Sequence, residues 1–332
     1  MEVRVAEFFA GVGGFRAAFQ HLPSFKFVFV NDCDKRCKTT YDANFPAPHM
    51  TVADIRSLDI ALMPDFDMMV GGFPCQSFST IGQRKGVEDE RGRLFYELLK
   101  IIDVKRPRVL LFENVKGLVF MEKGAIFRRM MKELEDRGFT VQFKILDTCI
   151  HSHVPQHRER VFIVAHQAGC FLSDFAFPPP VPGGALPAAE FLEPPGTVHE
   201  QYIYDAVKHP KSYGLLREEL IDRADAVPYQ FYVLWSCTQL RRKRVGCCPT
   251  LLAGMSRGGH SIPVLYDGRD IRALTPRECF NLQGFPKDYV LPPSVQRTVL
   301  YKQAGNALTM ALAKRIAGGI AESMGLGVLL PE

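Results

Sequence analysis

The sequence lacks several features that would place it at once in a specialised class of protein. No run of 18 apolar residues occurs in the 332-residue chain, which excludes a membrane-spanning helix. Internal repeats, heptads and low-complexity tracts are also missing, so nothing favours a repeat protein or a coiled coil. Glu2 and Arg4 interrupt the beginning of the chain and no apolar segment follows them, so we expect no secretion signal.

The chain also lacks an excess of charge and an obvious disulfide framework. Its hydrophobic fraction of 47% and charged fraction of 23% are ordinary for a protein that buries a core, which excludes a mainly disordered chain. The net charge of +5 permits a nucleic-acid partner without requiring one. The nine cysteines are odd in number and scattered, so we expect reduced thiols in a cytosol-like compartment.

What the sequence does have is a regular alternation of apolar runs with helical patterns through its first half. This alternation predicts an α/β fold with a doubly wound, mostly parallel sheet, in which ligands bind beyond the carboxyl ends of the strands. The expected strands are 3–9, 25–30, 66–70, 109–112, about 140–146 and 160–165, and the expected helices are 14–22, 34–44, 94–104 and 126–137.

A proline-rich stretch at 177–195 interrupts this pattern and predicts a hinge or linker. The chain then continues to about residue 301 with short strands, turns and clustered arginines, and 305–324 again predicts an amphipathic helix. We therefore expect one domain made of 1–176 with 300–332, and a smaller irregular domain over 177–299.

Glycines and acids follow the first predicted strands. Residues 8–15 (Phe-Phe-Ala-Gly-Val-Gly-Gly-Phe) would let backbone N–H groups approach a ligand, although the pattern is not the G-x-G-x-x-G of dinucleotide binders. Asp32 is placed to accept hydrogen bonds from a ribose diol, and Asp54 to meet an adenine amino group. Each site alone fits a plain turn or a helix N-cap equally well. Together they favour an adenosine-bearing cofactor.

Two further strand ends carry reactive groups. Cys75 follows Gly71-Gly72-Phe73-Pro74 in a constrained polar turn, and an exposed cysteine there could add to an electron-poor carbon. Glu113 closes the next strand, where a carboxyl group facing a cleft could hold a proton. The alternatives are a buried inert thiol for Cys75 and a surface helix cap for Glu113.

These blocks and four later ones occur in a characteristic linear order. The later ones are Gln-His-Arg-Glu-Arg at 156–160, Arg-Ala-Leu-Thr-Pro-Arg-Glu-Cys at 272–279, Leu-Gln-Gly-Phe-Pro at 282–286, and Gln-Ala-Gly-Asn-Ala-Leu at 303–308. In this order the sequence resembles the DNA (cytosine-5) methyltransferase family of the prokaryotic, restriction-modification type. The resemblance covers nearly the whole chain. It implies the class I S-adenosylmethionine-dependent methyltransferase fold with a smaller target-recognition domain.

The resemblance implies catalytic roles for four residues. Cys75 would add to C6 of a flipped-out cytosine, so that C5 can take a methyl group from S-adenosylmethionine. Glu113 would hydrogen-bond N3 and N4 of the base. Arg160 would bind O2 of the base, and Arg158 would orient the acid or a phosphate. Water is expected to remove the C5 proton.

The resemblance also implies S-adenosylmethionine as the cofactor, with no metal. Phe9 would stack on the adenine, and Asp32 stands where the family usually has Glu, so its reach is shorter by one methylene. Glu7 replaces the family's usual Asp before the glycine turn. The other residues expected in the pocket are Ala10, Gly11, Val12, Gly13, Gly14, Cys33, Asp54, Ile55, Gly72, Pro74, Leu94, Asn306 and Leu308.

Double-stranded DNA is the implied partner, and the target base must leave the duplex to be reached. The segment 77–91 resembles the family's mobile loop, and Thr250-Leu251 matches a landmark of its recognition region. The basic run 241–244 could hold phosphates or read bases, or be no more than a solvated charged surface. The residues expected on DNA are Ser79, Gln83, Arg84, Lys85, Arg241, Arg242, Arg244, Thr250 and Arg257.

Other assignments fit the sequence less well. A metal site at His151, His153 and His157 lacks a cysteine partner nearby. The related branch that methylates transfer RNA typically carries a Cys-Phe-Thr tripeptide, which this sequence does not have, and a non-catalytic DNA-binding relative would not need Cys75 and Glu113. We expect a monomer without membrane contact and any partner restriction endonuclease to act separately. The protein of this sequence would work in the cytoplasm of a prokaryote or the nucleus of a eukaryote.

Overall fold

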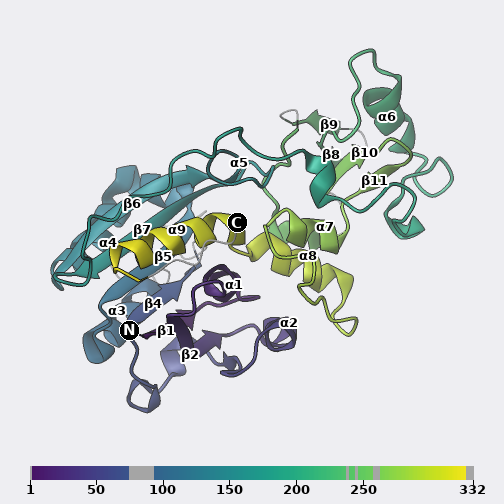
Figure 1. Ribbon diagram of the computed structural model, residues 1–332. Helices are drawn as coiled ribbons and strands as arrows, with labels where there is room; N and C mark the ends of the chain where they lie inside the picture. The colour runs from purple at the N-terminus through teal and green to yellow at the C-terminus, as the bar shows by residue number, and fades with distance from the viewer. Residues whose placement is uncertain (1, 75–92, 237–238, 244–245, 257–261, 327–332) are drawn as a thin grey trace. The chain divides into compact units, whose positions relative to one another are not determined.

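The computed structural model describes residues 2–74, 93–236, 239–243, 246–256 and 262–326 (Figure 1). The chain forms two compact units. Unit 1 consists of Met1–Leu146, Glu159–Pro179 and Ala313–Glu332, and unit 2 of Asp147–Arg158 and Pro180–Leu312. The division falls near residue 180, and residues 300–312 belong to unit 2. The domain bounds expected from the sequence, 1–176 with 300–332 and 177–299, stay a prediction. The excursion of 147–158 into unit 2 was not expected.

Unit 1 is built on a mostly parallel sheet. Within the described residues its seven strands have the order β3-β2-β1-β4-β5-β7-β6, and β7 runs antiparallel to β5. The doubly wound, mostly parallel sheet predicted from the sequence is therefore confirmed. The strands are β1 (Val3–Phe8), β2 (Phe25–Asp32), β3 (Thr51–Val52), β4 (Met68–Gly71), β5 (Val109–Val115), β6 (Phe139–Asp147) and β7 (Glu159–Gln167).

Helices flank this sheet, and its central strands are buried on both faces. Every residue of β4 is buried, as are the first four residues of β5, which explains why both strands are continuous apolar runs in the sequence. Helices α3 and α4 bury their apolar residues in one core with these strands. The helices are α1 (Gly14–Phe19), α2 (Lys35–Asn44), α3 (Arg93–Lys105), α4 (Ala125–Glu135) and α9 (Met310–Ser323). The sequence predicted one helix over 305–324. In the structure α8 (Arg297–Asn306) ends inside this range and α9 begins at Met310.

A buried acid lies under the turn between β1 and α1. Glu7 is fully buried and accepts a hydrogen bond from the Tyr41 hydroxyl at 3.2 Å. Tyr41 in turn accepts from Arg16, whose guanidinium also donates to the Pro46 and Pro48 carbonyls. Burial raises the pKa of Glu7 to about 8, while Tyr41, Arg16 and backbone amides at the start of α1 act in the opposite direction. Glu7 thus links the start of α1 to α2.

Unit 2 contains a small antiparallel sheet of order β11-β10-β8-β9. Its strands are β8 (Tyr232–Ser236), β9 (Gln239–Arg242), β10 (Pro263–Tyr266) and β11 (Ile271–Ala273). Its helices are α5 (Thr148–His151), α6 (Tyr213–Arg217), α7 (Pro276–Asn281) and α8 (Arg297–Asn306). Short strands and turns were expected here from the sequence.

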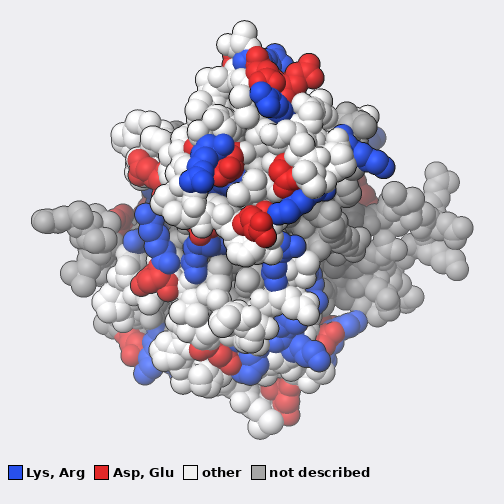
Figure 2. Space-filling model, turned by 90° about the vertical axis from the view of Figure 1, so that its right-hand side faces the viewer, with Lys and Arg blue, Asp and Glu red and all other residues white. Residues whose placement is uncertain are grey.

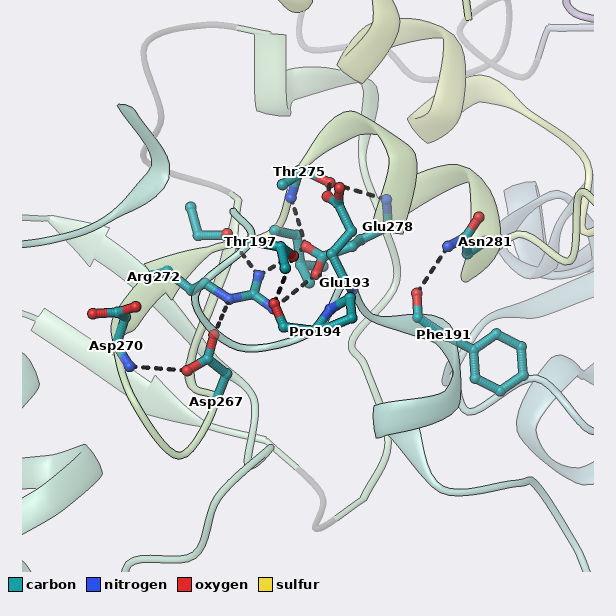
Figure 3. A network of polar contacts seen from close by, with 12 residues as sticks. Phe191, Glu193, Pro194, Thr197, Asp267, Asp270, Arg272, Thr275, Glu278 and Asn281 are labelled. Carbon is teal, nitrogen blue, oxygen red and sulfur yellow. Dashed lines mark hydrogen bonds and ion pairs between the residues drawn. The ribbon is translucent and has the colours of Figure 1, made fainter. Parts of the chain in front are cut away.

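A fully buried ion cluster joins β11 to α7 in unit 2 (Figure 3). Arg272 pairs with Asp267 at 2.6 Å and with both oxygens of Glu278 at 2.8 and 2.9 Å, and all three side chains are 0% exposed. Glu278 also accepts from the Thr275 amide, which completes a capping box on α7. The Glu193 amide donates to Glu278 as well, so the end of the proline-rich segment is held against this helix.

We predict that Arg272→Met lowers the free energy of unfolding by about 3–5 kcal/mol, because it leaves two buried carboxylates without their counter-ion. Urea titration followed by circular dichroism measures this. Arg269→Met is the matched control, since Arg269 is exposed and its 3.6 Å ion pair with Asp270 is at the surface. Equal losses in the two variants would contradict the prediction.

The buried Glu7 predicts a pH dependence of stability. Its folded-state pKa of about 8 exceeds the ordinary 4.5, so the folded chain binds more protons than the unfolded chain between these values. The free energy of unfolding should therefore fall as the pH rises through this window, by up to about 1.4 kcal/mol per unit.

Glu7→Gln should remove this part of the pH dependence, because the amide does not titrate. Urea titrations at pH 6 and pH 8 should show the variant gaining on the wild type as the pH rises. Glu135→Gln, on an exposed position of α4, is the control and should follow the wild type. Parallel pH profiles for Glu7→Gln and the wild type would refute the role of Glu7.

Candidate active site

The turn after β1 leaves a backbone surface open. Phe9, Gly11 and Gly13 all have positive φ angles, of 54°, 54° and 79°, and α1 begins directly after Gly13. A Cβ on Gly13 would lie 2.3 Å from the Phe45 ring, so this position requires glycine. A Cβ on Gly11 would meet nothing within 4 Å. The backbone at Gly11 can therefore be approached closely by a ligand.

Asp32, at the end of β2, lies against this turn. Its two carboxylate oxygens accept from the Gly11 amide at 2.8 Å and from the Asp34 amide at 2.7 Å. The parallel register that pairs Phe8 with Asn31 brings the two strand ends together. Burial raises the pKa of Asp32, and the two amides partly oppose this shift. The glycine turn and the acid that the sequence singled out are thus in direct contact.

Asp54 follows the short strand β3, which pairs with the end of β2. It caps the helical turn at Ile55–Ser57 and forms an ion pair with Arg56 at 2.5 Å. Hydrogen bonds from Arg56 hold the pKa of Asp54 near 2. Asp54 therefore acts as the helix N-cap that the sequence offered as an alternative. Contact with an adenine stays a prediction.

The groups at this edge of the sheet fit the cofactor that the sequence implies. A carboxylate at the end of β2 can accept hydrogen bonds from a ribose diol, the open backbone at Gly11 admits a ligand, and Phe9 offers a half-buried ring. Cys33 is exposed and Leu94 half-buried in the same unit. The flanking backbone, from Ala10 through Gly14, and Ile55 are mostly buried. Asn306 and Leu308 belong to unit 2, where Asn306 is exposed.

A partly buried ion pair lies at the carboxyl end of β5. Glu113 and Arg160 approach to 3.1 Å, and each side chain is only 13% exposed. Arg160 stands at the beginning of the antiparallel strand β7, opposite the end of β5. The predicted base-binding residues Glu113 and Arg160 are thus brought together.

The chain that leaves β4 is fixed beside this pair. A Cβ on Gly72 would lie 3.4 Å from Oε2 of Glu113, so the acid is next to the backbone at Gly72. The Asn114 side-chain amide donates to the Phe73 carbonyl at 2.9 Å. Pro74 is exposed and is the last described residue before Cys75. Cys75 lies outside the described residues.

A second ion pair flanks the first and was not foreseen from the sequence. Lys116 donates to both oxygens of Glu159 at 2.8 and 2.9 Å, and Arg160 donates to the Glu159 carbonyl at 2.7 Å. Lys116 directly follows the Glu-Asn-Val block and Glu159 lies inside the Arg-Glu-Arg block. Their positions in those blocks were the available signal.

Arg158 lies in the interior of unit 2 and is 2% exposed. Its Nη1 donates to the Leu251 carbonyl at 2.9 Å, and its Nη2 to the carbonyls of Gly305 and Ala307 at 3.2 and 2.8 Å. The sequence assigned Arg158 to orienting the acid or a phosphate. In the structure its terminal nitrogens bind main-chain carbonyls, while Glu113 pairs with Arg160.

The residues expected on DNA are only partly described. Arg242 pairs with Asp225 in unit 2, Arg241 is exposed, and Thr250 donates to the His157 carbonyl at 2.7 Å. Ser79, Gln83, Arg84, Lys85, Arg244 and Arg257 lie outside the described residues. On the face shown in Figure 2, described basic and acidic side chains are interspersed rather than gathered into one basic patch.

Two features of the described residues bear on other functions. In that part of the chain, no group of three or more His, Cys, Asp and Glu residues is placed to hold a metal ion. None of the helices described is both long and apolar enough to cross a membrane.

Comparison with known proteins gives consistent matches along the chain. The family model described as C-5 cytosine-specific DNA methylase matches residues 3–322. Type II methyltransferase M.Bsp6I of Bacillus sp. (strain RFL6) is 38% identical over 323 residues, which cover 97% of this chain and 99% of the relative. Type II methyltransferase M.DsaV of Dactylococcopsis salina is 33% identical over 95% of this chain and 85% of its own length.

The fold has matches among solved structures as well. The crystal structure of a DNMT2 mutant from Spodoptera frugiperda has a TM-score of 0.73 and 18% identity, and the match covers 96% of this chain and 99% of the other. At this identity the match shows the fold alone. The family match over almost the full chain, together with relatives above 30% identity, shows that this chain belongs to the C-5 cytosine-specific DNA methylases.

Proposed function

We propose that this protein methylates C5 of a cytosine that has been flipped out of a specific sequence in duplex DNA, through a transient bond between Cys75 and C6. The observation that carries the proposal is the Glu113–Arg160 pair beside Gly72, three positions before Cys75 in the chain. Family membership supports the reaction class.

The chemistry requires activation of the ring, because C5 of cytosine is a poor nucleophile. The Cys75 thiolate adds to C6, and the electron pair displaced from the C5–C6 bond makes C5 nucleophilic. Glu113 hydrogen-bonds N3 and N4, and Arg160 binds O2, so that charge developing on the ring is stabilised. After methyl transfer, water takes the C5 proton, the double bond forms again, and the thiolate leaves. Cys75 is regenerated.

S-adenosylmethionine, when bound, supplies a methyl group on a sulfonium that C5 can attack. Asp32 would accept from the ribose hydroxyls, Phe9 would stack on the adenine, and the backbone at Gly11 would lie along the methionine part. The Asp54 carboxylate would accept a hydrogen bond from the adenine amine on the part of its surface that the ion pair with Arg56 leaves accessible. The other residues in contact with S-adenosylmethionine would be Asn306 and Leu308.

The biological setting proposed here follows the curated relatives. Those relatives are named as type II methyltransferases from bacteria. We assign this chain to a restriction-modification system of the same type, acting as a monomer in the cytoplasm, with any partner endonuclease acting separately.

Methyl transfer to DNA and to transfer RNA, measured in parallel with tritiated S-adenosylmethionine, tests the reaction. Label should enter duplex DNA, and bisulfite sequencing of plasmid from expressing cells then gives the target sequence. Label in transfer RNA would favour the RNA-acting branch. Label in neither substrate would favour a non-catalytic DNA-binding relative.

Cys75→Ser should abolish both methyl transfer and the covalent adduct with DNA that contains 5-fluorocytosine, because the hydroxyl is a far weaker nucleophile than a thiolate. Denaturing gels with labelled DNA detect the adduct. Cys149→Ser is the matched control and should still be trapped, since Cys149 lies in unit 2 and has no proposed catalytic role. An adduct that survives in Cys75→Ser means that another residue is the nucleophile.

Asp32→Ala should weaken S-adenosylmethionine binding by tenfold or more, since a charged acceptor is worth about 1.5–3 kcal/mol. Calorimetry without DNA measures the dissociation constant. Asp34→Ala is the control, because Asp34 caps α2 two residues away, and its affinity should stay within about twofold of the wild type. Equal affinity for Asp32→Ala and the wild type would remove Asp32 from the cofactor site.

A further inference from the structure

Arg158 joins two segments of unit 2 that are far apart in the sequence. Its planar guanidinium donates to the Leu251 carbonyl through Nη1 and to the Gly305 and Ala307 carbonyls through Nη2. A buried cation needs hydrogen-bond partners, and here backbone oxygens from two segments accept from both terminal nitrogens. A displacement of either segment would break bonds to the same side chain.

The backbone that carries Arg158 is itself fixed. Its amide donates to Oδ1 of Asp147 at 3.1 Å, and His157 Nδ1 approaches Oδ2 of the same carboxylate at 2.5 Å. Asp147 is only 7% exposed. The backbone at Arg158 is therefore held in place by Asp147, and this fixes the position from which the guanidinium reaches the two segments.

The peptide at Leu251 is held from both sides. The Leu251 amide donates to the Gln156 side-chain oxygen at 3.1 Å, while the Leu251 carbonyl accepts from Arg158. Thr250 donates to the His157 carbonyl at 2.7 Å. Residues 156–158 thus fix the backbone position of Thr250-Leu251.

The second segment packs against the first with no free space. A Cβ on Gly305 would lie 2.2 Å from the Leu252 carbonyl carbon and 2.3 Å from the Ala253 nitrogen. Only glycine permits this approach of two backbones. The two segments therefore contact each other directly as well as through Arg158.

We propose that Arg158 is a positioning residue that links DNA binding to cofactor binding. The first segment carries Thr250, expected on DNA, and the second carries Asn306 and Leu308, expected on the cofactor, so this inference rests on the proposed function. Because one guanidinium holds both backbones, a ligand that orders one segment also orders the other. Such coupling is reciprocal: the cofactor tightens DNA binding by the same factor as DNA tightens cofactor binding.

The experiment compares Arg158→Lys with Arg272→Lys. Both replace a buried arginine of unit 2, but Arg272 bonds carboxylates and neither of the two segments. The dissociation constant of S-adenosylhomocysteine is measured by calorimetry, with and without a duplex oligonucleotide carrying the site mapped by bisulfite sequencing. The lysine presents its donors from a single nitrogen and cannot reproduce the planar fork in which Nη1 and Nη2 bind different carbonyls.

Arg158→Lys should weaken binding of S-adenosylhomocysteine without DNA by on the order of tenfold, and the gain in affinity on adding the duplex should fall towards one. Arg272→Lys should keep the wild-type gain even if it melts earlier. The salt dependence of DNA binding should keep its slope in Arg158→Lys, because no phosphate contact is lost. Wild-type cofactor affinity with a shallower salt slope would overturn the proposal and place Arg158 on a phosphate.

Hydrogen exchange on the wild type keeps the test independent of whether the variants fold. Adding S-adenosylhomocysteine alone should increase amide protection both at 303–309 and at 250–252, and leave the β8–β9 hairpin unchanged. Protection confined to 303–309 would overturn the coupling while leaving the proposed function intact. A wild type that binds neither ligand would overturn both.

Discussion

The site depends on the parallel pairing of β1, β2, β4 and β5, which makes the carboxyl ends of these strands meet at one edge. The register pairs Phe8 with Asn31 and with Gly71, and Gly71 with Phe112. The residues that follow these positions, the glycine turn, Asp32, Gly72 and Glu113, therefore come to the same edge. The antiparallel β7 begins where β5 ends, so Arg160 can reach Glu113 from the opposite direction. No loop has to bring the pair together.

Two buried arginines show different ways of offsetting the cost of removing a guanidinium from water. Arg272 is neutralised by two carboxylates, which fixes β11 against α7. The terminal nitrogens of Arg158 bond main-chain carbonyls, which fixes backbone segments that carry no opposing charge. The second arrangement suits a place where two peptide segments must keep a relative position and their own side chains must stay available. Asn306, between the two carbonyls bound by Nη2, is exposed.

The order of strands and helices in unit 1 could be predicted from the sequence because buried parallel strands are continuous apolar runs, and Asp32 and Glu113 are visible as acids where two of the strands end. The contacts of Arg158 could not, because a side chain that bonds distant carbonyls leaves no periodic pattern. The resemblance assigned Arg160 to O2 of the base and Arg158 to the acid or a phosphate, but the chain passes from unit 2 to unit 1 between these two residues. The ion pair of Asp54 with Arg56 and the cluster at Arg272 likewise depend on which groups meet in space, although the capping box at Thr275 and Glu278 follows a recognisable spacing.

The two acids that flank the glycine turn, Glu7 and Asp32, differ in length, and each has partners that suit the length of its side chain. Glu7 has one methylene more than Asp, and its carboxyl group reaches the Tyr41 hydroxyl on α2 at 3.2 Å. Asp32 has one methylene fewer than Glu, and its carboxylate is held by two backbone amides at 2.7 and 2.8 Å. A short side chain with both oxygens bonded loses little further freedom when a ligand binds. Glu7 thus stabilises the turn through its hydrogen bond with α2. Asp32 is already ordered at the edge of the sheet where a ribose would be bound.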